Sequence, residues 1–296
     1  IVGIAAFHSL FNVVNTILLF PFSKQLVKLA QTIVKASSEE QEFKLDERLM
    51  LTPSIAVSEC SISMEKMISK AKNGLDKATD LLLTGYNDDD YEFIKNNEEK
   101  VDHYEDLIGS FLMKLTTTKH LSEVDKNRSS KMLQAVGEFE RIADHASYMA
   151  NSSEEIHRKK LLFSPDAQDE INRIIAAVKE VYTATIDCYL SDNADKAQEI
   201  GPLRIVISEM CDMFKANHVE RLAAGICTTE QGFVFNDILY SCGRIADHSM
   251  NIAAIAYRFK SAAGADPTYM HDFKQRKDAA SEELYNRYYE KYLKKA

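Results

Sequence analysis

Apolar residues recur at helical spacing through most of the chain. In the range 89–117, for example, Val101, Tyr104, Ile108 and Leu115 are separated by three, four and seven residues, so they share one face of a helix. Polar segments containing Gly, Pro, Ser or Asp interrupt this pattern and mark helix ends. The pattern predicts long helices over 54–83, 89–117, 125–159, 165–190, 194–225 and 229–262.

The third and sixth predicted helices share a five-residue sequence. Arg141 to His145 and Arg244 to His248 both read Arg-Ile-Ala-Asp-His, at the same place on matching apolar stripes. An identity of this length at equivalent positions indicates an internal duplication. We therefore expect an all-α fold of two three-helix bundles, at 54–160 and 161–263.

Two further segments flank the predicted bundles. Residues 264–296 carry several tyrosines at helical spacing among many charges, which predicts a C-terminal helix with one face packed on the bundle. Residues 37–53 are expected to form a linker.

The first 22 residues contain no charged side chain. A helix of about 20 such residues can cross a bilayer. A buried core helix and a signal peptide are the alternatives, although the basic leader and cleavage site of a signal peptide are not seen. Lys24, Lys28 and Lys35 follow directly, and lysines beside a membrane exit favour the cytosolic side. We expect 1–36 to be the end of a membrane domain in the inner or plasma membrane, with the remainder in the cytosol. Because the chain begins with Ile1, we also expect missing upstream sequence.

Composition excludes several classes of protein. The net charge is −9 and no basic run is present, so there is no electrostatic footprint for nucleic acid. The five cysteines are scattered without a Cys-x-x-Cys pair, which argues against a disulfide framework or zinc site and favours a reducing compartment. Nucleophile motifs and Gly-rich phosphate loops are absent, so we predict no enzyme and no catalytic residue.

Carboxylates at four-residue spacing are the candidate functional groups. Glu140 and Asp144 share a helix face, and Glu140 lies on an otherwise apolar row, where a carboxylate is costly unless it is paired or metal-bound. Glu98 and Asp102 repeat the spacing on the preceding helix. If the two helices pack antiparallel, four carboxylates can converge, and such hard oxygen ligands suit Mg, Mn, Ca or iron. The alternatives are surface charges on solvated helices, or a carboxylate neutralised by Arg141.

His145 and His248 each follow an aspartate directly, so the two neighbours point in different directions on a helix. A di-iron oxidase would need Glu-x-x-His on two helices, and neither repeated run contains it. We expect both histidines to make hydrogen bonds between helices rather than to bind metal.

These residues carry a family resemblance. Glu140 to His145 resembles the E-R-I-x-D-H signature of the PhoU family, and Gly243 to His248 is its second copy, followed by Asn251 where the family often has Asn. Phe7 to Asn12 resembles the last membrane repeat of sodium/phosphate cotransporters with a PhoU-like tail, and His218 to Leu222 is similar to a run in those tails. The resemblance covers residues 1 to about 260.

The resemblance implies two three-helix bundles, each able to hold metal through E/D-x-x-x-D pairs. Glu98, Asp102, Glu140 and Asp144 match this pattern in the first repeat. The second repeat departs from it, because Arg204 and Ser208 align with the first pair, Gly243 replaces the Glu, and Asp247 alone remains. We therefore expect a divalent or iron cation in the first repeat and at most a weak contribution from Asp247.

Three functions follow as hypotheses. The leading one is the cytosolic regulatory tail, with the last membrane segment, of a sodium-dependent inorganic phosphate transporter. In this hypothesis the chain is attached to the membrane, and the missing upstream part binds sodium and inorganic phosphate. The sequence does not decide whether the chain forms a homo-oligomer. The first alternative is a free-standing, metal-binding PhoU-like regulator of phosphate uptake and signalling, and the second is a carboxylate-bridged metal oxidase. No substrate-binding residue can be named.

Overall fold

The computed structural model describes residues 2–19, 45–117, 121–191, 194–260 and 279–294. In these ranges every regular element is a helix and no strand is present. The chain divides into two units, Ile1–Lys44 and Leu45–Ala296. The first unit contributes α1 (Val2–Leu19), and the second contains all the other elements.

The membrane prediction for the N-terminal segment stays unconfirmed. None of the helices in the described ranges is both long enough and apolar enough to span a bilayer. Residues 20–36 of the predicted membrane end, including the three lysines, lie outside the described residues.

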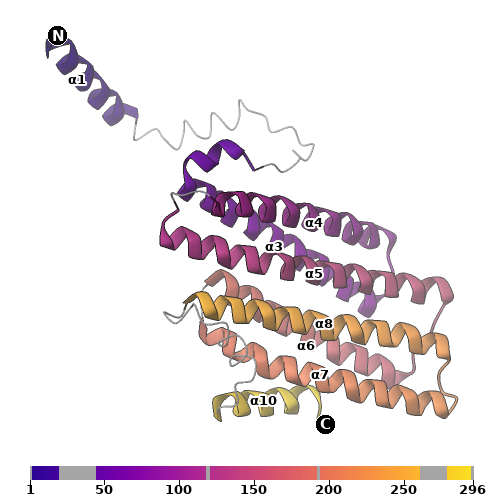
Figure 1. Cartoon of the computed structure of the whole chain (residues 1–296). Helices are drawn as coiled ribbons and strands as arrows, with labels where there is room; N and C mark the ends of the chain where they lie inside the picture. The colour runs from indigo at the N-terminus through magenta and orange to yellow at the C-terminus, as the bar shows by residue number, and fades with distance from the viewer. Residues whose placement is uncertain (1, 20–44, 118–120, 192–193, 261–278, 295–296) are drawn as a thin grey trace. The chain divides into compact units, whose positions relative to one another are not determined.

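Leu45–Ala296 is built from two successive three-helix bundles, as the duplication predicts (Figure 1). The first bundle contains α3 (Pro53–Thr84), α4 (Asp88–Thr116) and α5 (Glu123–Lys159), and the second contains α6 (Pro165–Ser191), α7 (Ala194–Ala223) and α8 (Thr229–Lys260). Within each bundle every helix packs against the other two, and α5 also packs extensively on α8. The contact between α5 and α8 joins the two bundles side by side.

The predicted helix ends agree with the structure to within two residues. Capping explains this agreement: Asn87 accepts a hydrogen bond from the Asp90 backbone N–H at 3.0 Å, and Ser122 accepts one from Asp125 at 3.1 Å. At the other end of α5, Lys160 adopts a left-handed conformation with φ 54°. One correction concerns the predicted linker, which contains a short 3₁₀ helix, η2 (Glu47–Leu51), while residues 37–44 lie outside the described range.

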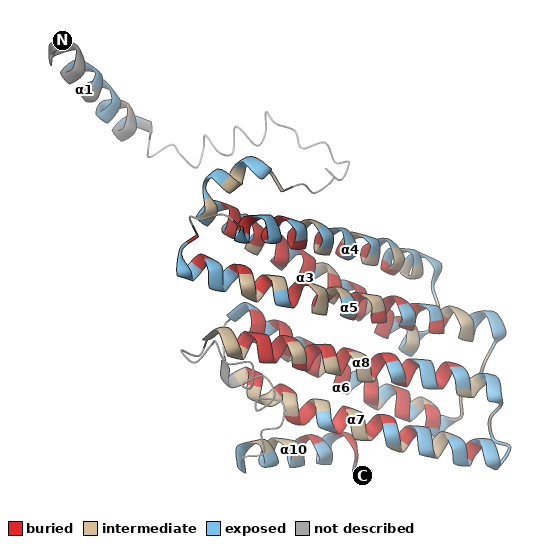
Figure 2. Ribbon diagram, in the orientation of Figure 1, coloured by how far each residue is buried: buried red, intermediate tan, exposed pale blue. Residues whose placement is uncertain are grey.

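The apolar stripes form the core of each bundle. The predicted stripe of α4, which includes Val101, Ile108 and Leu115, is buried along its whole length. Figure 2 shows buried positions on the facing sides of the six long helices and exposed positions on their outer sides. Burial of this apolar area is the main source of the folding free energy.

The predicted C-terminal helix is also present, as α10 (Ala279–Tyr292), while residues 261–278 lie outside the described part. It packs mainly on α7 through a face that includes buried Tyr288 and Tyr292. Arg173 of α6 donates a hydrogen bond to the Tyr292 carbonyl oxygen at 3.1 Å, and Tyr285 donates one to Glu209 at 2.8 Å. The expectation of one docked face is confirmed.

Candidate functional site

The four carboxylates predicted in the first repeat lie on facing sides of α4 and α5. Glu140 and Asp144 are one turn apart on α5, and their side chains are only 16% and 17% exposed. Glu98 is half-buried on α4, whereas Asp102, one turn later, is exposed. The charges of Asp102 and Asp144 both act on Glu98, so the two helices bring the pairs together.

Crowding and burial change the acidity of this cluster. Burial raises the pKa of Glu140 to about 7, and the neighbouring charge of Asp144 adds to the effect. Burial also raises the pKa of Asp144. Burial is likewise the main reason why the pKa of Glu98 is raised, with Asp144 and Asp102 contributing. The buried carboxyl groups of the cluster therefore lose their protons less readily than exposed ones.

Arg141 compensates for only part of the negative charge of the acidic cluster. Its guanidinium lies 3.4 Å from both Glu140 and Asp144, and its side chain is 62% exposed. An exposed pair at this distance contributes little. Neutralisation by Arg141, one of the alternatives drawn from the sequence, thus occurs but is incomplete.

The carboxylates do not form a ready-made metal cage. Over the residues that the structure describes, no three His, Cys, Asp or Glu side chains are arranged so that they could hold a metal ion. The donor chemistry nevertheless fits a hard cation, because all four groups are carboxylates and divalent charge would relieve their repulsion. Metal binding at this cluster stays a prediction.

In the second repeat, Asp247 is paired with two arginines. Its Oδ1 accepts hydrogen bonds from Nε and Nη2 of Arg204 on α7, at 2.8 and 2.6 Å. Its Oδ2 accepts one from Nη1 of Arg244, one turn away on α8, at 3.2 Å. The two guanidiniums compensate the charge of the carboxylate, so Asp247 is poorly suited to bind a cation as well.

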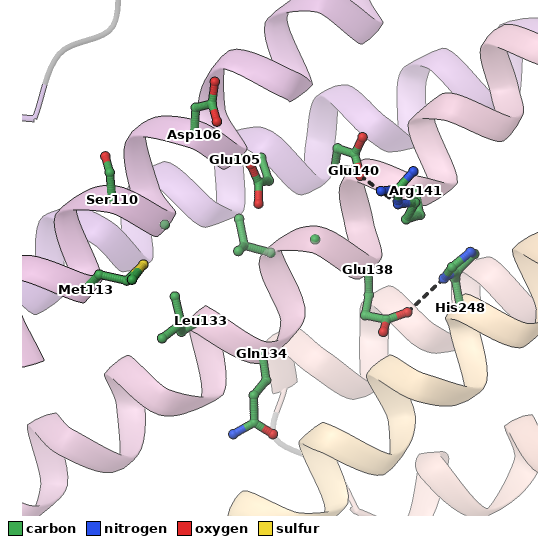
Figure 3. A pocket seen from close by; sticks show the side chains of 13 residues that line it. Glu105, Asp106, Ser110, Met113, Leu133, Gln134, Glu138, Glu140, Arg141 and His248 are labelled. Carbon is green, nitrogen blue, oxygen red and sulfur yellow. Dashed lines mark hydrogen bonds and ion pairs between the residues drawn. The ribbon is translucent and has the colours of Figure 1, made fainter.

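A pocket lies beside the acidic cluster, and the sequence analysis did not predict it. Its volume is about 610 Å³, and it is lined by α4 and α5 of the first bundle together with His248 of α8 (Figure 3). Glu105, Glu138 and Glu140 contribute carboxylates to its wall, and burial raises the pKa of Glu105. Glu138 Oε2 lies 2.8 Å from His248 Nδ1 and accepts a hydrogen bond from Asn251 at 2.9 Å.

Glu138 could not be singled out from the sequence, because its partners are more than a hundred residues away. The available signal was indirect: His248 and Asn251 lie one turn apart or less on the same helix face, and both require a polar partner. The predicted role of His248 in hydrogen bonding between helices is confirmed by its contact with Glu138.

His145 plays a different part at the same interface. Its ring stacks on His248 with the centroids 5.8 Å apart, and Tyr148 and Tyr240 contact it edge-on. Burial lowers the pKa of His145 to about 4, so the ring is neutral near pH 7. Its Nδ1 has no hydrogen-bond partner among the described residues, so His145 acts through packing rather than through the predicted hydrogen bond.

Comparison with known proteins agrees with this architecture. The PhoU domain matches the chain twice, at residues 64–153 and 171–256, which is one match for each bundle. The fold is similar to that of PhoU from Pseudomonas aeruginosa, with a TM-score of 0.64 and 16% identity over 68% of this chain and 95% of that one. It is also similar to the phosphate transport system regulatory protein PhoU from Streptococcus pneumoniae, with a TM-score of 0.61 and 14% identity over 72% of this chain and 99% of that one.

Comparison with curated protein sequences gives no significant match. The two structural similarities, at such low identity, establish the fold alone. The double match of the PhoU domain covers more than half of the 296 residues and coincides with the two bundles and their repeated Arg-Ile-Ala-Asp-His run. The chain therefore belongs to the PhoU domain family.

Proposed function

We propose that the chain regulates phosphate transport and is not an enzyme. The observation that carries the proposal is the match of the PhoU domain to both bundles. A structural neighbour with the same fold is named as a regulatory protein of the phosphate transport system. The long helical faces of the bundles offer surfaces for partner proteins, which suits a regulator.

The proposal can be tested in cells from which the gene for this chain has been deleted. We expect radiolabelled phosphate uptake to stop responding to the external phosphate concentration, and a plasmid carrying the gene to restore the response. An unchanged response of uptake in the deletion strain would contradict a regulatory role in phosphate transport.

We further propose that the acidic cluster of the first bundle binds one hard cation. Glu98, Asp102, Glu140 and Asp144 would supply the oxygen ligands, and divalent Mg or Mn, or iron, suits such donors. The burial of Glu140 and Asp144 beside Glu98 supports the proposal: burial is the main cause of the raised pKa of all three groups, neighbouring carboxylate charges add to it, and a bound cation would offset both effects. The second bundle lacks such a cluster at the aligned positions.

Thermal unfolding in the presence of Mn²⁺ tests this site. A ligand that binds only the folded state raises its stability by about 2.7 kcal/mol at a hundredfold excess over Kd. We expect Mn²⁺ to raise the Tm of the unmodified protein, and Glu140→Gln or Asp144→Asn to abolish the shift. The matched control, Asp247→Asn in the second repeat, should keep the shift. Equal losses in both repeats would contradict a site confined to the first bundle.

A second candidate function is the regulatory tail of a sodium-dependent phosphate transporter. It is favoured by α1, an uncharged helix in which Phe7, Leu10, Phe11 and Leu18 are all more than half exposed. Apolar surface of this kind normally requires a partner. In this proposal α1 contacts the membrane domain, sodium and inorganic phosphate bind upstream, and both bundles lie in the cytosol, alone or as a homo-oligomer.

Membrane fractionation separates this candidate from a free-standing regulator. We expect the full chain to sediment with membranes and a shortened chain of residues 45–296 to stay in the supernatant. Recovery of the full chain in the supernatant would contradict attachment through α1.

A further inference from the structure

A small pocket lies between α7 and α8 of the second bundle, at the positions that align with the acidic cluster of the first. Its volume is about 180 Å³. The residues of its wall that carry the argument are Arg204, Ser208 and Lys215 of α7 and Gly243, Arg244 and Asp247 of α8.

Gly243 opens this pocket. It stands at the signature position that Glu140 occupies in the first repeat. A Cβ atom added at Gly243 would meet Cys211 Sγ at 3.6 Å, which is ordinary van der Waals contact. A longer side chain would extend beyond this contact into the cavity. The absence of a side chain at Gly243 therefore leaves room for a ligand beside the cations.

The charge of the pocket is opposite to that of the acidic cluster. Arg204, Lys215 and Arg244 bring three cationic groups to its wall, against the carboxylates of Asp247 and Asp212. In the first repeat the four positions that align with Arg204, Ser208, Gly243 and Asp247 all carry carboxylates. The duplicated site has thus changed from one that favours a cation to one that favours an anion.

The hydrogen-bond donors of the pocket are only partly used. Asp247 accepts two hydrogen bonds from Arg204 and one from Arg244, and Arg244 Nη2 also lies 3.4 Å from His248 Nε2, whereas each guanidinium has five N–H groups. Lys215 is exposed and forms no ion pair with any described residue. Asp247 holds the two guanidiniums in place, and their remaining donors, with Lys215, are available to a ligand.

We propose that this pocket binds a small tetrahedral oxyanion, inorganic phosphate. The planar fork of Arg matches phosphate oxygens in a bidentate manner, Lys215 adds a point charge, and the Ser208 hydroxyl adds a further polar group. The choice of phosphate rests on the proposed function in phosphate transport, whereas the preference for an anion rests on the geometry.

Asp247 gives the pocket a means to select its ligand. Inorganic phosphate carries at least one proton near neutral pH, so it can donate a hydrogen bond to a carboxylate. Sulfate carries none and would meet the negative charge of Asp247 without a compensating contact. We therefore expect phosphate to bind more tightly than sulfate.

Equilibrium dialysis of the purified full chain with radiolabelled inorganic phosphate tests the proposal. We expect saturable binding that Lys215→Gln and Arg244→Gln each weaken tenfold or more, and that excess sulfate displaces poorly. The matched control is Arg141→Gln, which removes the arginine at the same signature position of the first repeat and should leave binding unchanged. Circular dichroism checks the fold, and Lys215→Gln changes an exposed residue without an ion pair among the described residues.

Several outcomes would overturn the proposal. The absence of saturable phosphate binding at millimolar concentration would make the pocket a purely structural ion-pair cluster. An equal loss in Arg141→Gln would move binding away from the second bundle. Binding to vesicles that contain phosphatidic acid, without binding of free phosphate, would assign the pocket to a lipid headgroup. None of these results bears on the deletion experiment, so the regulatory role is tested separately.

Discussion

At the scale of single residues, one substitution and one ion pair distinguish the two repeats. Glu140 places a half-buried carboxylate beside Asp144, whereas Gly243 leaves that space open. Asp144 is surrounded mainly by other carboxylates, whereas Asp247 lies between two guanidiniums. The shared Arg-Ile-Ala-Asp-His run thus supports two different electrostatic environments.

Glu140 should make the stability of the protein depend on pH. Its pKa is about 7 in the folded state against an ordinary value of 4.5, so the folded state binds its proton more tightly than the unfolded state. The stability that this proton contributes is complete below pH 4.5 and is lost as the pH rises through 7. We expect Glu140→Gln, without added metal, to become more stable than the unmodified protein above pH 7, on the order of 1–2 kcal/mol.

Urea unfolding at a series of pH values measures this difference. The control is Glu92→Gln, which changes an exposed carboxylate on α4 and should not alter the pH dependence. A stability difference between Glu140→Gln and the unmodified protein that does not change with pH would show that the Glu140 carboxylate is not perturbed.

The sequence could predict the site residues only in part. Four-residue spacing places Glu98 with Asp102 and Glu140 with Asp144, because helix geometry alone determines such neighbours. The pairing of Asp247 with Arg204 and of Glu138 with His248 depends on how helices far apart in the chain pack, which spacing does not encode. The missed residues are therefore those whose partners lie on another helix.

At the scale of elements, α6 and α7 are joined by a buried ion pair. Arg221 donates to Glu170 Oε2 at 2.7 Å, and their side chains are 9% and 3% exposed. Asn217 donates to Glu170 Oε1 at 2.7 Å. The Arg221 guanidinium also lies over the Phe235 ring of α8, 5.5 Å from its centroid, so the pair is in contact with all three helices of the second bundle.

Removing one partner of this pair should be costly. Glu170→Ala leaves the Arg221 charge buried without its carboxylate, and such changes typically cost about 3–5 kcal/mol. We expect a loss of that order in the free energy of urea unfolding. The control is Lys179→Ala, which breaks an exposed 2.7 Å ion pair between α6 and Asp80 of α3 and should cost less than about 1 kcal/mol. Similar losses in the two variants would contradict the special role of burial.

Elements were the most predictable level of this structure. Helix ends agreed to within two residues because the chain signals them locally, through Asn87, Ser122 and Gly85. The short helix η2 was missed, because five residues are too few to show an apolar period. Tandem bundles followed from the repeat, but the contact of α5 with α8 required the structure.

At the scale of the whole unit Leu45–Ala296, the interface between the two bundles contains polar and aromatic groups as well as apolar ones. Glu138 of α5 contacts His248 and Asn251 of α8, and His145 stacks on His248 at the same height. Because α5 packs on α8 as extensively as on α3, neither bundle can lose its fold without exposing a large face of the other. The bundles are therefore expected to unfold together.

Two buried cysteines allow this cooperativity to be measured. Cys60 of α3 and Cys242 of α8 are both 0% exposed, one in each bundle. Burial raises the pKa of Cys60 to about 12 and also raises that of Cys242, so neither thiol should react with an alkylating reagent in the folded protein. We expect pulsed alkylation across a urea series, read by mass spectrometry, to give the same midpoint for both thiols.

Glu138→Ala, which removes the partner of His248 and Asn251, should separate the two midpoints, whereas Glu99→Ala on the exposed face of α4 should not. Separate midpoints in the unmodified protein would show instead that the bundles are independent folding units.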